Sequence, residues 1–179
     1  MIGLVLLAAG GSRRFGSPKQ LAVVEGETLL RRACRTAAQF PGRAVVVLGA
    51  HAETLRAEVE GVEIVINDDW ERGIATSIHA GVRALADTDA IVIALADQPA
   101  VGLAELLSLV AKHEETGAPI VAAAYGNTIG VPALFHRSLF DELLALSGDE
   151  GARKLLRTRQ VVTVAMSNAA WDIDQVEDL

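Results

Sequence analysis

Cysteine is almost absent from this sequence: Cys34 is the only one among 179 residues. A single cysteine excludes an intramolecular disulfide and a cluster of thiolate metal ligands. Aromatic residues are also scarce, at 4%, whereas hydrophobic residues make up 51%, so the core must be built from Val, Leu, Ile and Ala. Such an aliphatic composition is typical of a buried parallel sheet that is covered by helices.

Long apolar runs are missing as well. No segment approaches the roughly 18 consecutive apolar residues that a membrane-spanning helix needs. The short apolar run 2–7 has no basic region before it and continues directly into an arginine-containing loop, which is not the pattern of a secretion signal. We therefore expect a cytoplasmic protein without a membrane partner.

Positive charge is in deficit, because 16 Lys and Arg residues face 23 Asp and Glu residues and the formal net charge is −7. This acidity argues against general binding to nucleic acid or to a membrane surface. The N-terminal region is the exception: no acidic residue precedes Glu25, whereas Arg13, Arg14 and Lys19 all lie before it. A cationic loop on an acidic protein indicates a small anionic ligand that binds at one place.

Apolar runs alternate with segments of helical periodicity along the first two thirds of the chain. This alternation predicts a single-domain, three-layer α/β/α fold with a mostly parallel, Rossmann-like sheet. After Tyr125 the alternation stops, and we expect a C-terminal antiparallel or inserted region that folds onto the same sheet. The expected strands are 2–7, 44–48, 62–66, 90–95, 120–124, 131–135 and 161–165. The expected helices are 28–40, 54–59, 74–86 and 102–115, with two short helices on either side of 147–151 and a short C-terminal one; residues 126–130 are expected to form a turn.

The loop after the first strand carries the clearest functional signal. Its glycines, at 10, 11 and 16, allow backbone N–H groups to approach an anion closely, and Arg14 and Lys19 supply the charge that a polyphosphate requires. The dinucleotide fingerprint G-x-G-x-x-G fails in both registers, and the P-loop pattern fails because Ser17-Pro18 stands where Lys-Ser/Thr is required. We interpret the loop as a nucleoside triphosphate site. The structural alternative is a glycine-rich βα turn with solvated arginines.

Asp97 lies two residues beyond the apolar run 90–95. Ligands of open α/β sheets bind beyond the carboxyl ends of the strands, so Asp97 and the loop at 8–19 should meet at one crevice. A desolvated carboxylate is costly unless a cation meets it, and Mg²⁺ bound by one or two carboxylates and substrate phosphates fits this need. The alternative is that Asp97 caps a helix or forms a turn.

The order Leu-Ala-Ala-Gly-x-Ser-x-Arg-Phe-Gly-x-x-Lys-x-Leu, which runs from Leu7 to Leu21, resembles the signature of the molybdenum-cofactor nucleotidyltransferases. That family belongs to the larger group of sugar-phosphate nucleotidyltransferase-like enzymes, so the resemblance implies a nucleotide-diphospho-sugar transferase-like fold. Four further blocks extend it along nearly the whole chain. They are Ala96-Asp97-Gln98-Pro99, where Ala96 replaces the family's usual glycine; Asn67-x-x-Trp70-x-x-Gly73-x-x-x-Ser77-x-x-x-Gly81; Gly130-x-Pro132-x-Leu134-Phe135 with Gly148-Asp149-x-Gly151-Ala152-Arg153; and Asp172-Ile173-Asp174-x-x-Glu177-Asp178-Leu179, where Gln175-Val176 replaces Thr-Pro.

Together with this resemblance, the residues suggest a nucleotide-binding part at 1–100 and an acceptor-binding part at 101–179. Structural alternatives stay open, since Ser77 and Gly81 could serve close helix packing, Trp70 could anchor its loop, and Asp174 could be a helix N-cap. The expected catalytic residues are Lys19, Arg14 and Asp97. The expected nucleotide-binding residues are Leu7, Ala8, Ala9, Gly10, Arg14, Lys19, Asn67 and Ser77. The expected acceptor-binding residues are Gly130, Pro132 and Arg153, and the expected ligands of Mg²⁺ are Asp97, Asp174 and Asp172.

The implied reaction is nucleotidyl transfer from an NTP to the phosphate of a molybdopterin-type cofactor, with release of pyrophosphate. By resemblance, Leu-Ala-Ala-Gly accompanies cytidylyl transfer and Leu-Ala-Gly-Gly accompanies guanylyl transfer, which favours CTP over GTP. Three alternatives stay open: an enzyme on the same scaffold that uses GTP or another phosphorylated acceptor, an NAD(P)-dependent reductase, and a non-catalytic maturation partner that delivers cofactor to a molybdoenzyme.

Overall fold

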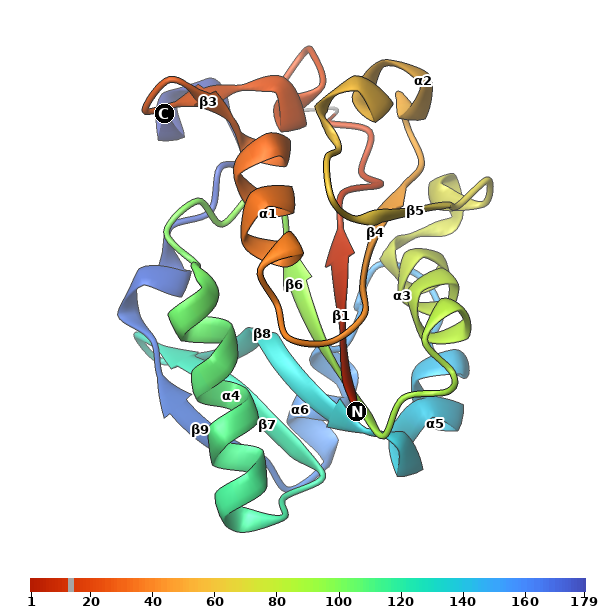
Figure 1. The fold of residues 1–179 in the computed structure, drawn as a ribbon, viewed down its shortest axis with the longest axis vertical. Coiled ribbons are helices and arrows are strands. Elements are labelled where there is room, and N and C mark those ends of the chain that lie inside the picture. The colour runs from red at the N-terminus through yellow and green to blue at the C-terminus, as the bar shows by residue number, and fades with distance from the viewer. Residues whose placement is uncertain (13–14) are drawn as a thin grey trace.

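The computed structural model describes residues 1–12 and 15–179. They form a single-domain α/β fold around a seven-stranded sheet in the order β5-β4-β1-β6-β8-β7-β9, as Figure 1 shows. Six of these strands share one direction, and β8 runs antiparallel to both of its neighbours, so the sheet is mostly parallel as the sequence predicts. The strands are β1 Ile2–Leu7, β4 Ala44–Leu48, β5 Glu63–Ile66, β6 Ala90–Leu95, β7 Ile120–Tyr125, β8 Thr128–His136 and β9 Val162–Ala165, and a separate small hairpin pairs β2 Val23–Val24 with β3 Glu27–Thr28.

Helices cover both faces of the sheet because its central strands are apolar on both sides. Val5 and Ile93 project to a core shared with α3, α5 and α6, whereas Leu4 and Val92 project to a second core shared with α1 and α4. Every one of these four side chains is at most 1% exposed. The α-helices are α1 Leu29–Ala38, α2 Ala52–Leu55, α3 Ile74–Ala84, α4 Leu103–Thr116, α5 Phe140–Leu144 and α6 Arg153–Thr158.

The parallel pairing of β1 with β6 creates the edge at which ligands of such sheets bind. The two strands pair from Ile2 with Ala90 to Leu7 with Leu95. The Ala96 amide then donates to the Leu7 carbonyl at 3.1 Å, so the segments after both strands leave the sheet side by side. The loop at 8–19 and Asp97 therefore start from neighbouring positions.

Several boundaries differ from those expected from the sequence. The turn expected at 126–130 contains only two residues between the paired Tyr125 and Thr128, because Gly126 adopts a positive φ of 55° and closes a tight hairpin. The strand expected at 131–135 is accordingly longer and begins at Thr128. The helix expected at 54–59 is a single α-turn, Ala52–Leu55, followed by the 3₁₀ turn Arg56–Glu58, and the C-terminal helix is a 3₁₀ turn, Val176–Asp178.

No helix in the described part of the chain is long and apolar enough to cross a membrane.

Gly81→Ala should lower the free energy of unfolding by about 1–3 kcal/mol, the usual cost of overpacking a core. A Cβ at Gly81 would overlap the Cγ1 atom of Val5, since α3 packs directly on β1 there. Helix propensity alone predicts the opposite sign, a gain of roughly 1 kcal/mol. Urea unfolding measures the difference, and a stabilised Gly81→Ala protein would contradict the packing account. Adding Val5→Ala should restore part of the loss.

Candidate active site

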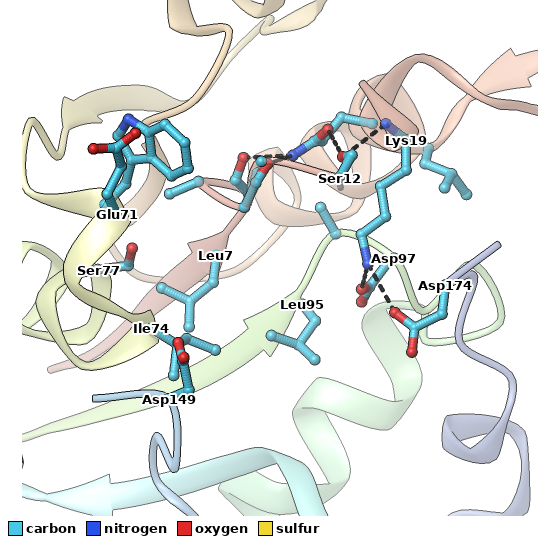
Figure 2. Close-up of a pocket in the computed structure, with 18 residues that line it drawn as sticks. Leu7, Ser12, Lys19, Glu71, Ile74, Ser77, Leu95, Asp97, Asp149 and Asp174 are labelled. Carbon is cyan, nitrogen blue, oxygen red and sulfur yellow. Dashed lines mark hydrogen bonds and ion pairs between the residues drawn. The ribbon is translucent and has the colours of Figure 1, made fainter. Parts of the chain in front are cut away.

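A cavity of about 580 Å³ opens where the segments after β1 and β6 leave the sheet. Figure 2 shows Lys19 extending from one side of the cavity toward Asp97 and Asp174, with Glu71 and Ser77 on the opposite side. The lining residues come from the end of β1 and the loop after it, the start of α1, the segment 70–77, the end of β6 with the residues after it, and two later segments. They are Leu7, Ala8, Ala9, Gly10, Gly11, Ser12, Lys19, Gln20, Leu29, Trp70, Glu71, Ile74, Ser77, Leu95, Ala96, Asp97, Asp149 and Asp174.

Gln20 fixes the conformation of the loop after β1 through hydrogen bonds of its side chain. Its side chain is only 3% exposed, and Nε2 donates to the carbonyls of Ala8 and Gly10, both at 3.0 Å. The Ser12 hydroxyl donates to Gln20 Oε1 at 3.2 Å and accepts from the Lys19 amide at 2.9 Å. These bonds tie the start of the loop to its end, so the position of Lys19 is set by the loop itself.

Lys19 lies between two carboxylates that are far apart in the sequence. Its Nζ atom is 2.5 Å from Asp97 Oδ2 and 3.2 Å from Asp174 Oδ1. The Lys19 and Asp97 side chains are 18% and 19% exposed, whereas Asp174 is about half exposed. The structure thus brings together the N-terminal cation and two of the acids that the sequence predicts to share a site.

Burial and neighbouring charges shift the pKa values of Asp97 and Lys19. Burial raises the pKa of the Asp97 carboxyl above its ordinary value; Lys19 opposes this increase, and the charges of Asp172 and Asp174 add to it. Burial works against the charge on Lys19, but Asp97 and Asp174 together outweigh it and raise the pKa of the ammonium group. The ionised form of Asp97 is therefore less stable here than in water, and a cation that binds this carboxylate would stabilise it.

The Asp97 carboxylate also has unused binding capacity. Its Oδ1 atom is buried and has no hydrogen-bond partner in the described part of the chain. Within residues 1–12 and 15–179, however, no group of three or more His, Cys, Asp or Glu side chains is arranged to hold a metal ion. Mg²⁺ is usually bound by one or two carboxylates, which Asp97 and Asp174 could supply, together with oxygens from a ligand or water.

Most of the expected nucleotide-binding residues line the first cavity. Leu7, Ala8, Ala9, Gly10, Lys19 and Ser77 line the cavity, and Asn67 is not among the lining residues. The Asn67 side chain is buried, and its Nδ2 atom donates to the hydroxyls of Thr76 at 2.8 Å and Ser77 at 2.9 Å. Its amide thus orients the first turn of α3. Arg14 lies outside the residues that the structure describes.

Trp70 lines the cavity through packing that the sequence alone does not reveal. A Cβ at Gly11 would lie 2.9 Å from Trp70 Cζ3, and one at Gly49 would lie 2.6 Å from Trp70 Cβ. The indole is therefore held between the loops that follow β1 and β4, and Glu71 beside it also lines the cavity. Glycines after two neighbouring strands were the available signal for a bulky side chain between them.

A second cavity, of about 380 Å³, adjoins the first and shares Leu7, Ile74, Leu95 and Asp149 with it. Of the predicted acceptor-binding residues, Gly130 and Arg153 line this second cavity and Pro132 does not. Asp172 lines this second cavity, whereas Asp174 lines the first. The two aspartates of the C-terminal segment therefore reach different cavities. Burial and the Asp172 charge raise the pKa of Tyr125 in the same wall, and Arg153 opposes that increase.

The fold is that of a nucleotidyltransferase. The chain belongs to the MobA-like NTP transferase family, whose model matches residues 4–164.

Curated relatives match along the whole chain or along part of it. Nicotine blue oxidoreductase of Paenarthrobacter nicotinovorans is 33% identical, over 98% of this chain and 93% of the relative. Purine catabolism protein PucB of Bacillus subtilis is 30% identical, over 98% of this chain and 89% of the relative. Molybdenum cofactor cytidylyltransferase of Escherichia coli is 32% identical over 87 residues, which are 47% of this chain and 45% of that enzyme.

Solved structures of similar chains have the same fold. The crystal structure of the Mycobacterium tuberculosis Rv0371c homologue from Mycobacterium sp. strain JC1 superposes with a TM-score of 0.87 at 33% identity, covering 99% of this chain and 92% of that one. A structure of Mycobacterium tuberculosis Rv0371c in complex with manganese superposes with a TM-score of 0.82 at 28% identity, covering 99% of this chain and 95% of that one.

Asp97→Asn should raise the melting temperature of the metal-free protein near pH 7. Because the pKa of Asp97 is raised in the folded state, the folded protein binds this proton more tightly than the unfolded chain does. The ionised carboxylate therefore costs stability above the folded pKa, and the cost disappears as the pH falls through that pKa toward the unfolded value. Asparagine resembles the neutral form, so the difference from the wild type should be largest near pH 7 and shrink toward about pH 4.

Thermal melts in EDTA over this pH range measure the effect. Asp68→Asn, at an exposed aspartate, is the matched control and should change stability by no more than about 0.5 kcal/mol. An Asp97→Asn protein that melts below the wild type at pH 7 would contradict the raised pKa of Asp97.

Proposed function

We propose that the protein transfers a cytidylyl group from CTP to the phosphate of a molybdopterin-type acceptor, with Mg²⁺ as the metal. The single observation that carries this proposal is the meeting of Lys19, Asp97 and Asp174 at a cavity bounded by a glycine-containing loop. The family supports nucleotidyl transfer, and the partial match to a molybdenum cofactor cytidylyltransferase supports the choice of substrates.

In the proposed reaction, an oxygen of the acceptor phosphate attacks the α-phosphorus of the NTP. A new P–O–P linkage forms, the bond from the α-phosphorus to the β-bridging oxygen breaks, and pyrophosphate leaves with that electron pair. A phosphate monoester has a second pKa of about 6 and is mostly ionised near neutral pH, so no general base is required. The protein has to supply alignment and neutralisation of charge.

The residues of this chain divide that work between the two cavities. Backbone groups of the loop from Leu7 to Gly10 bind the nucleotide, and Lys19, with Arg14, neutralises the triphosphate. Arg153 and the backbone around Gly130 bind the acceptor in the second cavity. The wall shared by the two cavities would then hold the attacking oxygen close to the α-phosphorus.

The proposed metal ligands fit a divalent cation. Asp97 offers a buried Oδ1 atom without a hydrogen-bond partner among the described residues, and Asp174 lies on the other side of Lys19. A bound Mg²⁺ would neutralise charge on the α-phosphate and on the departing pyrophosphate. Asp172 lines the second cavity, so we propose that it approaches the metal from the side of the acceptor.

Three other functions stay open as alternatives, and one of them is supported by a relative. GTP or another phosphorylated acceptor would use the same residues, and the base preference rests on the resemblance of Leu-Ala-Ala-Gly to cytidylyl enzymes. A relative that is 33% identical over almost the whole chain is named an oxidoreductase, which keeps an NAD(P)-dependent reductase as the second candidate. A maturation partner that delivers cofactor to a molybdoenzyme is the third, and it requires no turnover.

The deciding experiment incubates the protein with each NTP, Mg²⁺ and molybdopterin and measures release of pyrophosphate. CTP should give the highest rate. A preference for GTP would replace the proposed nucleotide, whereas NAD(P)H consumption with a dye acceptor and no pyrophosphate would favour the reductase. Retention of cofactor without turnover would favour the delivery partner.

Asp97→Asn and Lys19→Ala should each lower turnover at least about a hundredfold, the scale of losing one preorganised electrostatic contact. Lys112→Ala is the matched control, because Lys112 is paired with Glu115 on the surface of α4, away from either cavity. Pyrophosphate release by the three variants at saturating substrates is the measurement. Wild-type turnover in either site variant would remove that residue from the proposed site.

Lys19→Met should have opposite effects on the two ligands of the site. Lys19 lies between Asp97 and Asp174, so its removal takes a positive charge away from both carboxylates and should tighten binding of Mn²⁺ alone by about tenfold, or about 1.4 kcal/mol. The same change removes a cation from the triphosphate loop and should weaken binding of CTP in EDTA. Calorimetric titration measures both, with Asp97→Asn as the variant that should lose Mn²⁺ binding. Parallel weakening of both ligands by Lys19→Met would contradict the geometry.

A further inference from the structure

Gln98 joins three separate parts of the chain. Its side chain is nearly buried, at 5% exposure. The Nε2 atom donates to the Val131 carbonyl of β8 at 3.1 Å and to the Ala169 carbonyl of the C-terminal segment at 2.8 Å. An amide nitrogen has two N–H groups, so both donors are used and the orientation of the side chain is fixed.

The C-terminal segment meets the same loop at a second point. The Ile173 amide donates to the Asp97 carbonyl at 2.9 Å, and the Ile173 side chain is fully buried against Leu29. Residues 97 and 98 therefore hold the segment at both Ala169 and Ile173. Asp172 lies between these two points and lines the second cavity. Asp174 directly follows Ile173 and lines the first cavity.

The other end of the Gln98 amide is unused within the described residues. Its Oε1 atom is buried without a hydrogen-bond partner, and Gln98 lines the second cavity beside Asp172. A buried acceptor without a partner lowers stability. The two donors of Gln98 satisfy carbonyls from two distant segments, and they provide the structural reason for glutamine at this position.

We propose that Gln98 is a positioning residue that sets the separation between Asp97 and Asp174. The inference rests on the proposed function, since it gives those carboxylates a metal to bind. Gln98 acts without touching metal or phosphate: its donors hold the C-terminal segment against the loop that carries Asp97. Its bond to Val131 places the wall of the acceptor cavity relative to the same two carboxylates.

Gln98→Met keeps the length of the side chain and removes both donors. Binding of Mn²⁺ to the free protein should weaken about tenfold, as it does when residues that orient metal ligands are lost. The Mg²⁺ concentration for half-maximal pyrophosphate release should rise by a similar factor. Binding of CTP in EDTA should be unchanged, because the loop from Leu7 to Lys19 is untouched.

Asn168→Ala is the matched control. Asn168 is the neighbour of Ala169, and its Nδ2 atom donates to the Ala100 carbonyl and to Glu105 Oε1, both at 2.8 Å. Its loss also removes two hydrogen bonds from the C-terminal segment but leaves the Gln98 and Ile173 contacts in place. Mn²⁺ affinity should therefore stay at the wild-type value in Asn168→Ala.

The outcomes separate the inference from the function on which it rests. Mn²⁺ binding that requires Asp97 but is equal in the wild type and Gln98→Met overturns the positioning role alone, as does an equal loss in Gln98→Met and Asn168→Ala. Absence of Mn²⁺ binding by the wild type overturns the metal site and the inference with it. If Gln98→Met does not fold, Gln98→Asn takes its place; its shorter side chain reaches at most one carbonyl, and wild-type Mn²⁺ affinity there would overturn the proposal.

Discussion

The site depends on a largely buried carboxylate at the end of an apolar strand. Asp97 follows β6, which is buried on both faces, and one of its oxygens has no hydrogen-bond partner among the described residues. Lys19 compensates part of this charge, yet the pKa of Asp97 is still raised by burial. Such an arrangement lowers the stability of the protein without a bound cation. It favours the binding of additional positive charge together with a polyphosphate.

Much of this arrangement could be predicted from the sequence, because two simple rules apply to it. Aliphatic runs of four to seven residues locate strands, and loops after parallel strands meet at one edge of a sheet. These rules place β4 and β6 at the observed residues and bring Lys19 to the same edge as Asp97. Asp174 is more distant in sequence, and its place beside Lys19 was suggested only by the resemblance of the C-terminal block to a known family.

The remaining features depend on contacts between distant segments, which no local pattern encodes. Asn67 was expected at the nucleotide, but its amide bonds to Thr76 and Ser77 and orients α3. Trp70 fills space that exists only because Gly11 and Gly49 face each other across two loops. The two-residue turn after Tyr125 follows from the positive φ of Gly126, and the second glycine at Gly130 makes a longer turn look equally suitable from the sequence.

The antiparallel strand β8 of the seven-stranded sheet has a consequence for how this scaffold can change its chemistry. Because β8 reverses direction, the tip of the β7–β8 hairpin emerges at the same edge as Asp97, and Tyr125 and Gly130 face the second cavity. A hairpin tip can lengthen or shorten without moving the parallel strands that carry the first cavity. Changes at residues 126–127 can thus reshape the second cavity while the strands that carry the first cavity are preserved.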